Sequence, residues 1–285
     1  WAVTCSTITN NERSFFEGTP KAKDLPTKMA DDAVAERDGA QPRGERYSEF
    51  KLYGFWRSSC TWRVRIALNA KGIPYETISV NLFEKDQARE GHASRNPMRQ
   101  VPVLEFVDCD GDNVVVRLTQ SLAIVEFLET AFADRGGGLL PVDPVARARA
   151  KEVAEIVNSG IQPLQNMSVV ERVEGIGWDG GKGSGMRFAQ RNIENGLSAL
   201  EALLAPHYDE GGAMAAGPYA LGTHGPNLAD ACLIPQLYNA RRFGVDCAPY
   251  RTLLMIERAC EDHPWFRDAV PELQPDYKVY HNHMM

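Results

Sequence analysis

Two serines and a cysteine stand between a short aromatic segment and a basic, amphipathic one in GFWRSSCTWRVRIAL, residues 54–68. The pattern predicts a turn from a strand into a helix, where the first N–H groups lack partners and the helix dipole is positive. A thiolate or another anion is stabilised at such a point. Ser58 or Ser59 can cap the helix, and Cys60 would lie in its first turn. These residues alone favour a simpler alternative, a plain serine cap beside a small buried cysteine.

A second candidate lies in NPMRQVPVLEF, residues 96–106. Pro102 enters a predicted strand, which requires either an edge position or a cis bond. With a cis bond, Val101 can offer its N–H and C=O to an extended peptide, as an added strand would. A trans proline at the start of an edge strand fits the same residues equally well.

The third candidate is LTQSLAI, residues 118–124. Gln120 and Ser121 stand at or just before a predicted helix start, which suits a bound carboxylate. As a lone feature an ordinary cap is the commoner explanation. Taken together, the three candidates fit one ligand: a small, extended, thiol-bearing peptide with a carboxylate at one end.

The elements that must position these residues alternate between strand and helix in the first half of the chain. A strand at 51–56, a helix at 60–72 and a strand at 74–82 form a β-α-β unit with parallel strands. Asp110 and Gly111 mark a hairpin between two further strands. The remaining elements expected there are strands at 101–107 and 113–118 and a helix at 119–132.

The second half reads as helical. One long helix carries Val153, Ile156, Val157, Ile161 and Leu164 on one face and is interrupted near Pro163. Another helix repeats Ile193, Leu197, Leu200 and Leu204, and Asn227 with Asp230 forms a capping box that opens a third. Between the first two helices, residues 177–185 hold five glycines and predict a flexible loop.

This order predicts an α/β domain followed by an all-α one, that is, a thioredoxin-like domain joined to a helical bundle. We expect a thioredoxin-like domain at 50–134, a linker at 135–143 and a helical domain at 144–276. A flexible leader at 1–49 and a tail at 277–285 flank them. Because the chain starts at Trp1, the leader is interpreted as part of a longer segment.

Composition limits the partners. The 285 residues carry a net charge of −7, which disfavours nucleic acid and anionic membranes. No apolar run approaches the roughly 18 residues of a membrane helix. The six dispersed cysteines form neither a metal site nor a disulfide framework, and His281 with His283 lacks visible partners for a metal. We therefore expect a small-molecule substrate and a reducing, cytoplasmic location.

Five strings, RSSCTWRVRIAL, NPMRQVP, QSLAI, GIQPLQNMSV and NLADACLIPQ, occur in this order at characteristic spacing. With them the chain resembles the zeta-class glutathione transferases over about residues 51–276. The resemblance implies the glutathione transferase architecture, glutathione as cofactor and a homodimer. Members of this family include maleylacetoacetate isomerase.

The resemblance also implies which residues bind glutathione. Ser58, Ser59 and Cys60 would lie at its thiol and form the catalytic set, Val101 before a cis Pro102 would pair with its cysteinyl backbone, and Gln120 with Ser121 would hold its γ-glutamyl carboxylate. The implied contacts outside these groups are Thr61, Trp62, Arg63, Gln87, Gln162, Asn166, Met167 and Ser168. Two departures from the family pattern are Met167, where leucine is common, and a shorter segment before Gln87.

The implied reaction is the glutathione-dependent isomerisation of maleylacetoacetate to fumarylacetoacetate, a step in tyrosine and phenylalanine catabolism. Maleylpyruvate and related cis-diacids are alternative substrates, and α-haloacids are side substrates. Ser58 is the first choice for activating the thiol, with Cys60 in support. Arg242 would bind a substrate carboxylate, aided by Arg57 or Arg63, while its neighbour Arg241 replaces an expected acidic residue.

Two other functions fit parts of the pattern. Cys60 is a candidate nucleophile for glutathione-dependent thiol-disulfide exchange, which needs an exposed thiolate but no serine. A non-catalytic binding module is the third hypothesis, although such a module is expected to lose site residues that this chain retains.

Overall fold

The computed structural model of the chain describes residues 46–208 and 217–277. The chain divides into two units, residues 1–40 and 41–285, and every element described belongs to the second. Nearly all of the predicted leader and tail, with His281 and His283, therefore lies outside the described residues.

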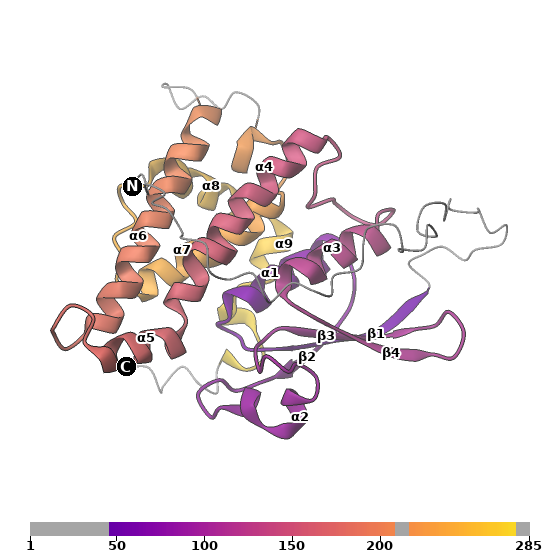
Figure 1. The fold of residues 1–285 in the computed structure, drawn as a ribbon. Coiled ribbons are helices and arrows are strands. Elements are labelled where there is room, and N and C mark those ends of the chain that lie inside the picture. The colour runs from indigo at the N-terminus through magenta and orange to yellow at the C-terminus, as the bar shows by residue number, and fades with distance from the viewer. Residues whose placement is uncertain (1–45, 209–216, 278–285) are drawn as a thin grey trace, which may run out of the picture. The chain divides into compact units, whose positions relative to one another are not determined.

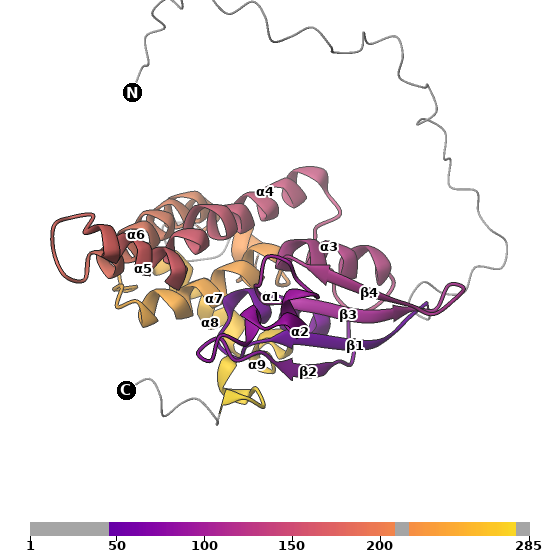
Figure 2. The ribbon, with the colours of Figure 1, turned by 60° about the horizontal axis from the view of Figure 1, so that its bottom comes forward.

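A four-stranded sheet has the order β2-β1-β3-β4 (Figure 1). β1 and β2 are parallel, whereas β3 is antiparallel to both of its neighbours, so the predicted β-α-β unit and hairpin are confirmed. Figure 2 shows β2, β1 and β3 running side by side. The strands are β1 (Tyr47–Gly54), β2 (Glu76–Ser79), β3 (Val103–Asp108) and β4 (Val114–Thr119).

β1 begins at Tyr47, earlier than the predicted strand start at residue 51, and so includes three residues assigned to the leader. The reason is an aromatic cluster. The Tyr47 ring packs edge-on to Phe106 and Phe127, with ring centroids 5.4 and 5.2 Å away, and Phe50 stacks on Phe106. Burial of these rings holds a polar-looking segment in the sheet.

Helices α1 (Ser59–Ala70) and α3 (Ser121–Ala131) lie on one side of the sheet, and α2 (Glu90–Ala93) lies on the other (Figure 1). α1 is buried around almost its whole circumference because α3, α7 and α9 also pack on it. Its basic sequence suggests a solvent-facing side, yet the side chains of Arg63 and Arg65 are 0% and 1% exposed. Buried guanidinium groups need hydrogen-bond partners, and both arginines have them.

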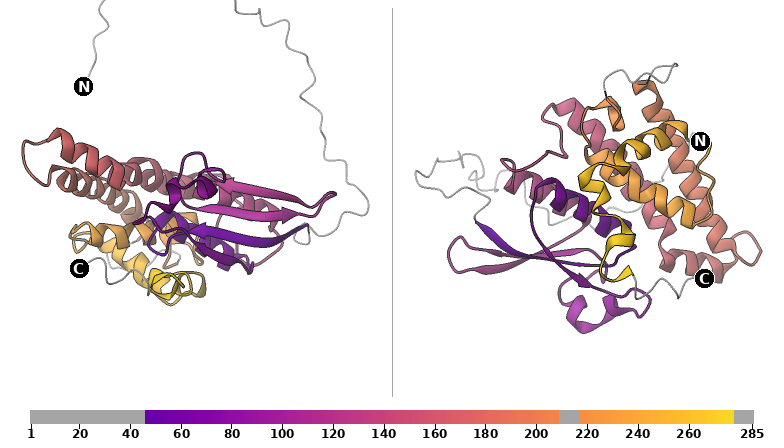
Figure 3. Two further views of the ribbon diagram at one scale, coloured as in Figure 1. Left: turned by 90° about the horizontal axis from the view of Figure 1, so that it is seen from below. Right: turned by 180° about the vertical axis from the view of Figure 1, so that it is seen from behind.

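The second half is helical, as predicted (Figure 3). Residues 135–143 contain no helix or strand, and the Glu129 carboxylate anchors them by accepting from the N–H groups of Leu139 and Leu140 at 2.9 and 3.3 Å. Glu129 also forms a buried ion pair with Lys71. The helices are α4 (Pro144–Glu155), α5 (Met167–Ile176), α6 (Ser184–Leu204), α7 (Leu228–Arg242), α8 (Arg251–Glu261) and α9 (Pro264–Arg267).

The interruption predicted near Pro163 is present and begins earlier. After α4 the chain passes through a π-helix (Ile156–Ile161) and a 3-10 helix (Gln162–Gln165). Proline cannot donate the backbone hydrogen bond of an α-helix, and the wider π turn carries the chain into the tighter one. The predicted capping box of Asn227 and Asp230 is confirmed at the start of α7.

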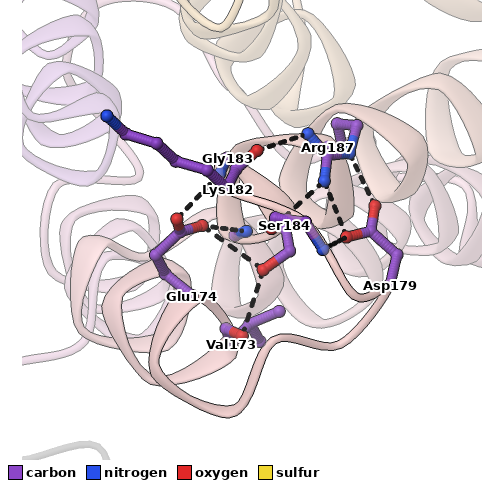
Figure 4. A network of polar contacts seen from close by, with 9 residues as sticks. Val173, Glu174, Asp179, Lys182, Gly183, Ser184 and Arg187 are labelled. Atoms are coloured by element: carbon purple, nitrogen blue, oxygen red, sulfur yellow. Dashed lines mark hydrogen bonds and ion pairs between the residues drawn. The ribbon is translucent and has the colours of Figure 1, made fainter.

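The glycine-rich segment 177–183 is organised by side chains, a feature that the expected flexible loop did not include (Figure 4). Arg187 donates two 2.6 Å bonds to Asp179. Glu174 accepts from the N–H groups of Gly183 and Gly185 at 2.7 and 2.9 Å. Gly185 already belongs to α6, and its missing side chain permits close packing, because a Cβ there would lie 2.2 Å from the Val170 carbonyl oxygen.

The segment around Asp276 bonds to the turn after β1 and to the end of β2. The Asp276 carboxylate accepts 3.0 Å bonds from Trp56 N–H and Ser79 Oγ. Arg65 donates to the carbonyl oxygens of Ala269 and Trp56 at 2.9 and 3.0 Å. The last residues described are therefore part of the support for the turn between β1 and α1.

Candidate active site

Sheet register brings the three predicted segments to one edge. Tyr53 of β1 is paired with Val103 of β3, and Val103 is paired with Thr119 of β4. The chain leaves β1 toward Ser58, enters β3 from Val101 and leaves β4 at Gln120, all at this edge. The α1 and α3 N-termini therefore open beside the Val101 backbone.

The start of α1 is capped by Ser58, whose Oγ accepts from Thr61 N–H at 3.2 Å. Ser59 is buried and Cys60 is half-buried. No acidic residue lies in the first turn, so the positive end of the helix has no carboxylate of its own there. This geometry confirms the predicted cap and places the two serines and the cysteine at an anion-accepting helix end.

Val101 lies two residues before the start of β3, and its peptide bond to Pro102 is cis, as the resemblance implied. Neither the N–H nor the C=O of Val101 bonds to any of the described residues. The preceding carbonyl, that of Gln100, is fixed by Asn96 Nδ2 at 2.8 Å and His92 Nε2 at 2.9 Å. A backbone held in this way can pair with an extended ligand.

The start of α3 has an unusual backbone. Gln120, the N-cap, is exposed and has a φ of 67°, in the left-handed region that few non-glycine residues occupy, and its side chain makes no capping bond. Such conformations persist where the surroundings impose them, and they cluster at ligand sites. Ser121 is buried beside it and accepts from Arg63 Nη1 at 3.3 Å.

The remainder of the predicted 58–63 block faces inward. Thr61 packs on Gly54, where an added Cβ would lie 2.3 Å from Thr61 Cγ2. The Trp62 ring is buried, edge-on to Tyr238 at 5.5 Å. Arg63 is completely buried. Direct contact of these three side chains with glutathione stays a prediction, and their burial shows that they support the turn from within.

Gln162 reaches the start of α1 from the helical half. Its Nε2 donates to Cys60 Sγ, and its Oε1 accepts from Arg63 Nη2 at 2.7 Å. Asn158 Oδ1 also accepts from Arg63, at 3.0 Å. The sequence interpretation missed Asn158. Its position four residues before Gln162 is the signal that places both on one helical face.

The other predicted contacts are less closely connected. Gln87 lies in a 3-10 helix (Asp86–Ala88), and its buried Oε1 has no hydrogen-bond partner among the described residues. Asn166 caps α5 and accepts from Ser168 N–H and Oγ, while Met167 is exposed. The roles of these four residues stay predictions.

Two arginines, Arg57 and Arg242, lie near enough to each other for their charges to interact. Burial, followed by the neighbouring charge of Arg242, lowers the pKa of Arg57 to about 10, which still leaves it protonated at neutral pH. Burial also lowers the pKa of Arg242, and none of the described ion pairs includes Arg242. Tyr238, four residues before Arg242 on α7, shares this environment and was also missed.

Arg241 and Arg242 are both exposed but have different partners. Arg241 donates to Glu257 Oε1 of α8 at 2.6 Å, whereas Arg242 donates to Asn239 Oδ1 at 2.9 Å. The basic residue at a position expected to be acidic is therefore neutralised locally. Of the two adjacent arginines, Arg242 is the one whose charge acts on Arg57.

Residues 46–208 and 217–277 contain neither a metal-binding cluster nor a membrane-spanning helix. No cluster of three or more histidine, cysteine, aspartate or glutamate side chains there can hold a metal ion. None of the helices in these ranges is long and apolar enough to cross a membrane.

Comparison with known proteins agrees with this geometry. The family model for the glutathione S-transferase N-terminal domain matches residues 57–131. The maleylacetoacetate isomerase of Mus musculus is 42% identical over 228 residues, which are 79% of this chain and 94% of the mouse protein.

Solved structures of maleylacetoacetate and maleylpyruvate isomerases are also similar to this chain. The maleylacetoacetate isomerase of Anaeromyxobacter dehalogenans, with glutathione bound in its active site, superposes with a TM-score of 0.67 at 41% identity. That match covers 80% of this chain and 98% of the bacterial one. A maleylpyruvate isomerase described as a zeta-class bacterial glutathione S-transferase gives a TM-score of 0.67 at 37% identity, covering 79% of this chain and 99% of that one.

Proposed function

The chain belongs to the zeta-class glutathione transferase family, and on that premise we propose that it isomerises maleylacetoacetate to fumarylacetoacetate with glutathione as cofactor. Maleylpyruvate is the nearest alternative among the cis-diacids. The observation that carries the proposal is the anion-accepting start of α1 together with the neighbouring charges of Arg57 and Arg242. A dianionic substrate and an anionic sulfur both require such local positive potential, because the whole chain is negative.

The residues present fit glutathione. The Val101 backbone groups have no partner among the described residues and can pair with a peptide. Ser121 is in the first turn of α3, where the backbone N–H groups have no intrahelical acceptor and can bind a carboxylate. Gln87 carries a buried acceptor without a partner. When bound, glutathione supplies a thiolate that adds reversibly to the cis double bond, so that the bond can rotate.

The chain's own side chains hold charge during this reaction. Ser58 Oγ accepts from Thr61 N–H, which leaves its hydroxyl hydrogen to donate to a sulfur anion. The helix dipole acts in the same direction and favours the thiolate. Arg57 and Arg242 bind and orient the carboxylates of the diacid and stabilise negative charge that develops between them.

We propose that Cys60 supports the site without attacking substrate. Its Sγ is engaged by Gln162 Nε2, and a second thiolate beside the glutathione sulfur would repel it. Transferase activity on α-haloacids would use the same activated thiol.

We also propose a cytoplasmic homodimer acting in tyrosine and phenylalanine catabolism. The five cysteines among the described residues are free thiols, which suits a reducing compartment. Exposed apolar side chains on β4 and around the start of α4 suit a protein contact; they are Val114, Val115, Val142 and Val145. Light scattering should give twice the mass of one chain, and a monomer at micromolar concentration would contradict the dimer.

The direct test incubates the purified protein with glutathione and maleylacetoacetate and couples the product to a fumarylacetoacetate hydrolase. Signal is expected only with glutathione present. A parallel assay with maleylpyruvate ranks the two diacids by kcat/KM. Absence of turnover with both substrates would refute the proposed function.

A further inference from the structure

Arg63 is a buried cation without an anionic partner among the described residues. Its side chain is 0% exposed, and its guanidinium donates to three neutral oxygens. These are Ser121 Oγ at 3.3 Å, Asn158 Oδ1 at 3.0 Å and Gln162 Oε1 at 2.7 Å. Its Nε is buried and has no hydrogen-bond partner in the part of the chain that the structure describes. A buried charge is costly without a counter-ion, so an anion bound nearby would stabilise this arrangement.

The guanidinium fixes the orientation of the Gln162 amide. Arginine only donates hydrogen bonds, so the group facing it must be the amide oxygen. The Gln162 nitrogen is thereby turned to the opposite side, where it donates to Cys60 Sγ. A glutamine that is otherwise free to flip thus presents its N–H groups to the start of α1, where the thiol of a ligand is expected.

The same logic applies at the other helix start. Because Ser121 Oγ accepts from Arg63, the serine hydroxyl hydrogen must point elsewhere. Ser121 is the first residue of α3, the position predicted to hold a carboxylate. The Arg63 guanidinium therefore orients both Ser121 and Gln162. The serine hydroxyl can donate to the carboxylate of the predicted ligand, and the glutamine amide can donate to its thiol.

We propose that Arg63 is a positioning residue for glutathione: it orients Ser121 toward the carboxylate and Gln162 toward the sulfur, and the bound anion offsets its buried charge. The proposal rests on the proposed function only in that glutathione occupies this site. In this proposal Arg63, which is completely buried, acts through the neighbours that accept its hydrogen bonds rather than by touching the ligand. It also joins α1 to α3 and to the helical half, so both parts of the site share one support.

Arg65 provides a matched control on the same helix. It is buried to the same degree, and its guanidinium donates to the carbonyl oxygens of Ala269 and Trp56 rather than to any predicted ligand residue. Replacing either arginine by lysine removes the fork of donors while retaining the charge. The two variants therefore separate loss of a buried guanidinium from loss of positioning.

The experiment measures glutathione binding alone, by calorimetry, for wild type, Arg63→Lys and Arg65→Lys. We expect Arg63→Lys to weaken glutathione binding by about tenfold or more, the effect of losing hydrogen bonds to a charged group. Arg65→Lys should lower Tm but change the Kd by less than about twofold. Equal losses of affinity in both variants, or unchanged affinity in Arg63→Lys, would overturn the proposal.

A second variant keeps the test decisive if Arg63→Lys folds poorly. Gln162→Met removes the positioned donor together with one of the three acceptors of the Arg63 guanidinium. It should raise the Kd for glutathione and the apparent pKa of the bound thiol in a pH titration of thiolate absorbance. In a double-mutant cycle, Arg63→Lys and Gln162→Met should be non-additive. Unchanged glutathione binding and an unchanged thiol titration in Gln162→Met would overturn the proposal that Arg63 positions Gln162 toward the sulfur.

The outcomes also separate this inference from the proposed function. A wild-type protein that binds glutathione but isomerises neither diacid would refute the function and leave the positioning role measurable by binding. A wild-type protein that does not bind glutathione would overturn both.

Discussion

Helices α1 and α6 both begin at a serine, and their first turns are completed in opposite ways. At α6 the chain supplies its own anion: Glu174 accepts from the N–H groups of Gly185 and Gly183. At α1 no acidic residue lies in the first turn, and Ser58 satisfies only the Thr61 N–H. The helix dipole is positive at both N-termini. The difference is that the first-turn N–H groups of α1 have no carboxylate from the first turn and can bind an external anion.

This difference separates the structural helix start of α6 from the proposed ligand-binding start of α1. The bonds from Gly185 and Gly183, more than the charge of Arg187, hold the pKa of Glu174 below its ordinary value. The carboxylate is thus a permanent part of the α6 cap. At α1 the same stabilisation becomes available only when a ligand brings its negative charge.

The largest effect is expected from Ser58→Ala. Loss of the hydroxyl removes a donor to the thiolate, and kcat should fall on the order of 100-fold, as for other donors that stabilise a reacting anion. KM for glutathione should change far less, and loss of the cap should cost about 1 kcal/mol of unfolding free energy. Steady-state kinetics and thermal melts measure these quantities.

The matched control is Ser184→Ala at the start of α6. It should lower Tm while kcat stays at the wild-type value, because among the described residues the Ser184 hydroxyl bonds only to Val173 and Glu174. Full activity in Ser58→Ala would abolish the distinction between the two helix starts.

Arg242→Gln should be next in size. Losing a charged hydrogen-bond donor to a substrate carboxylate should raise KM for the diacid by about tenfold or more. KM for glutathione should be unaffected. Arg241→Gln is the control, because that side chain is paired with Glu257 and should leave KM for the diacid within about twofold. Similar KM values in the two variants would remove Arg242 from the site.

Glu174→Gln should affect stability alone, with Tm lower by a few degrees and kcat unchanged. Because the folded-state pKa of Glu174 is below its ordinary value of 4.5, its stabilisation is complete above pH 4.5 and is lost as the pH falls through the lowered value. The Tm difference between variant and wild type should therefore shrink in this acidic range. A constant difference from pH 7 to pH 3 would show that charge is irrelevant to the α6 cap.

Among the predicted site residues, Cys60→Ala should have the smallest effect on catalysis. If Ser58 activates the thiol and Cys60 only supports it, kcat/KM should fall by less than about tenfold, equivalent to about 1.4 kcal/mol of transition-state stabilisation. Glutathione-dependent disulfide reduction, measured with hydroxyethyl disulfide, should be weak in wild type and in this variant. Strong reductase activity that disappears in Cys60→Ala would instead favour the nucleophilic cysteine.

Local patterns were sufficient where a short motif sets its own geometry. The Ser58 cap, the hairpin around Gly111 and the capping box of Asn227 and Asp230 all depend on residues within a few positions of each other, and all are confirmed. The same holds for the order of strands and helices in the first half, because alternating β and α periods are read along the chain.

Long-range contacts were beyond such reasoning. Arg63 and Arg65 read as the polar side of an amphipathic helix, and only the packing of the helical half on α1 makes both of them buried. Asn158 joins the site through a bond to Arg63, 95 positions earlier. The 177–183 loop reads as flexible because its glycines are visible in sequence, whereas the pairing of Asp179 with Arg187 depends on the folded geometry.

The bonds of Arg65 have a consequence for synthesis on the ribosome. One of its acceptors, the Ala269 carbonyl oxygen, lies 204 positions further along the chain. The acceptor of Trp56 N–H, the Asp276 carboxylate, is also translated late. A nascent first domain therefore carries a guanidinium that lacks one of its two acceptors and an amide whose acceptor has not yet been translated. Because a buried donor without an acceptor is unfavourable, the turn ahead of α1 gains its final support only after residues 269–276 have left the exit tunnel.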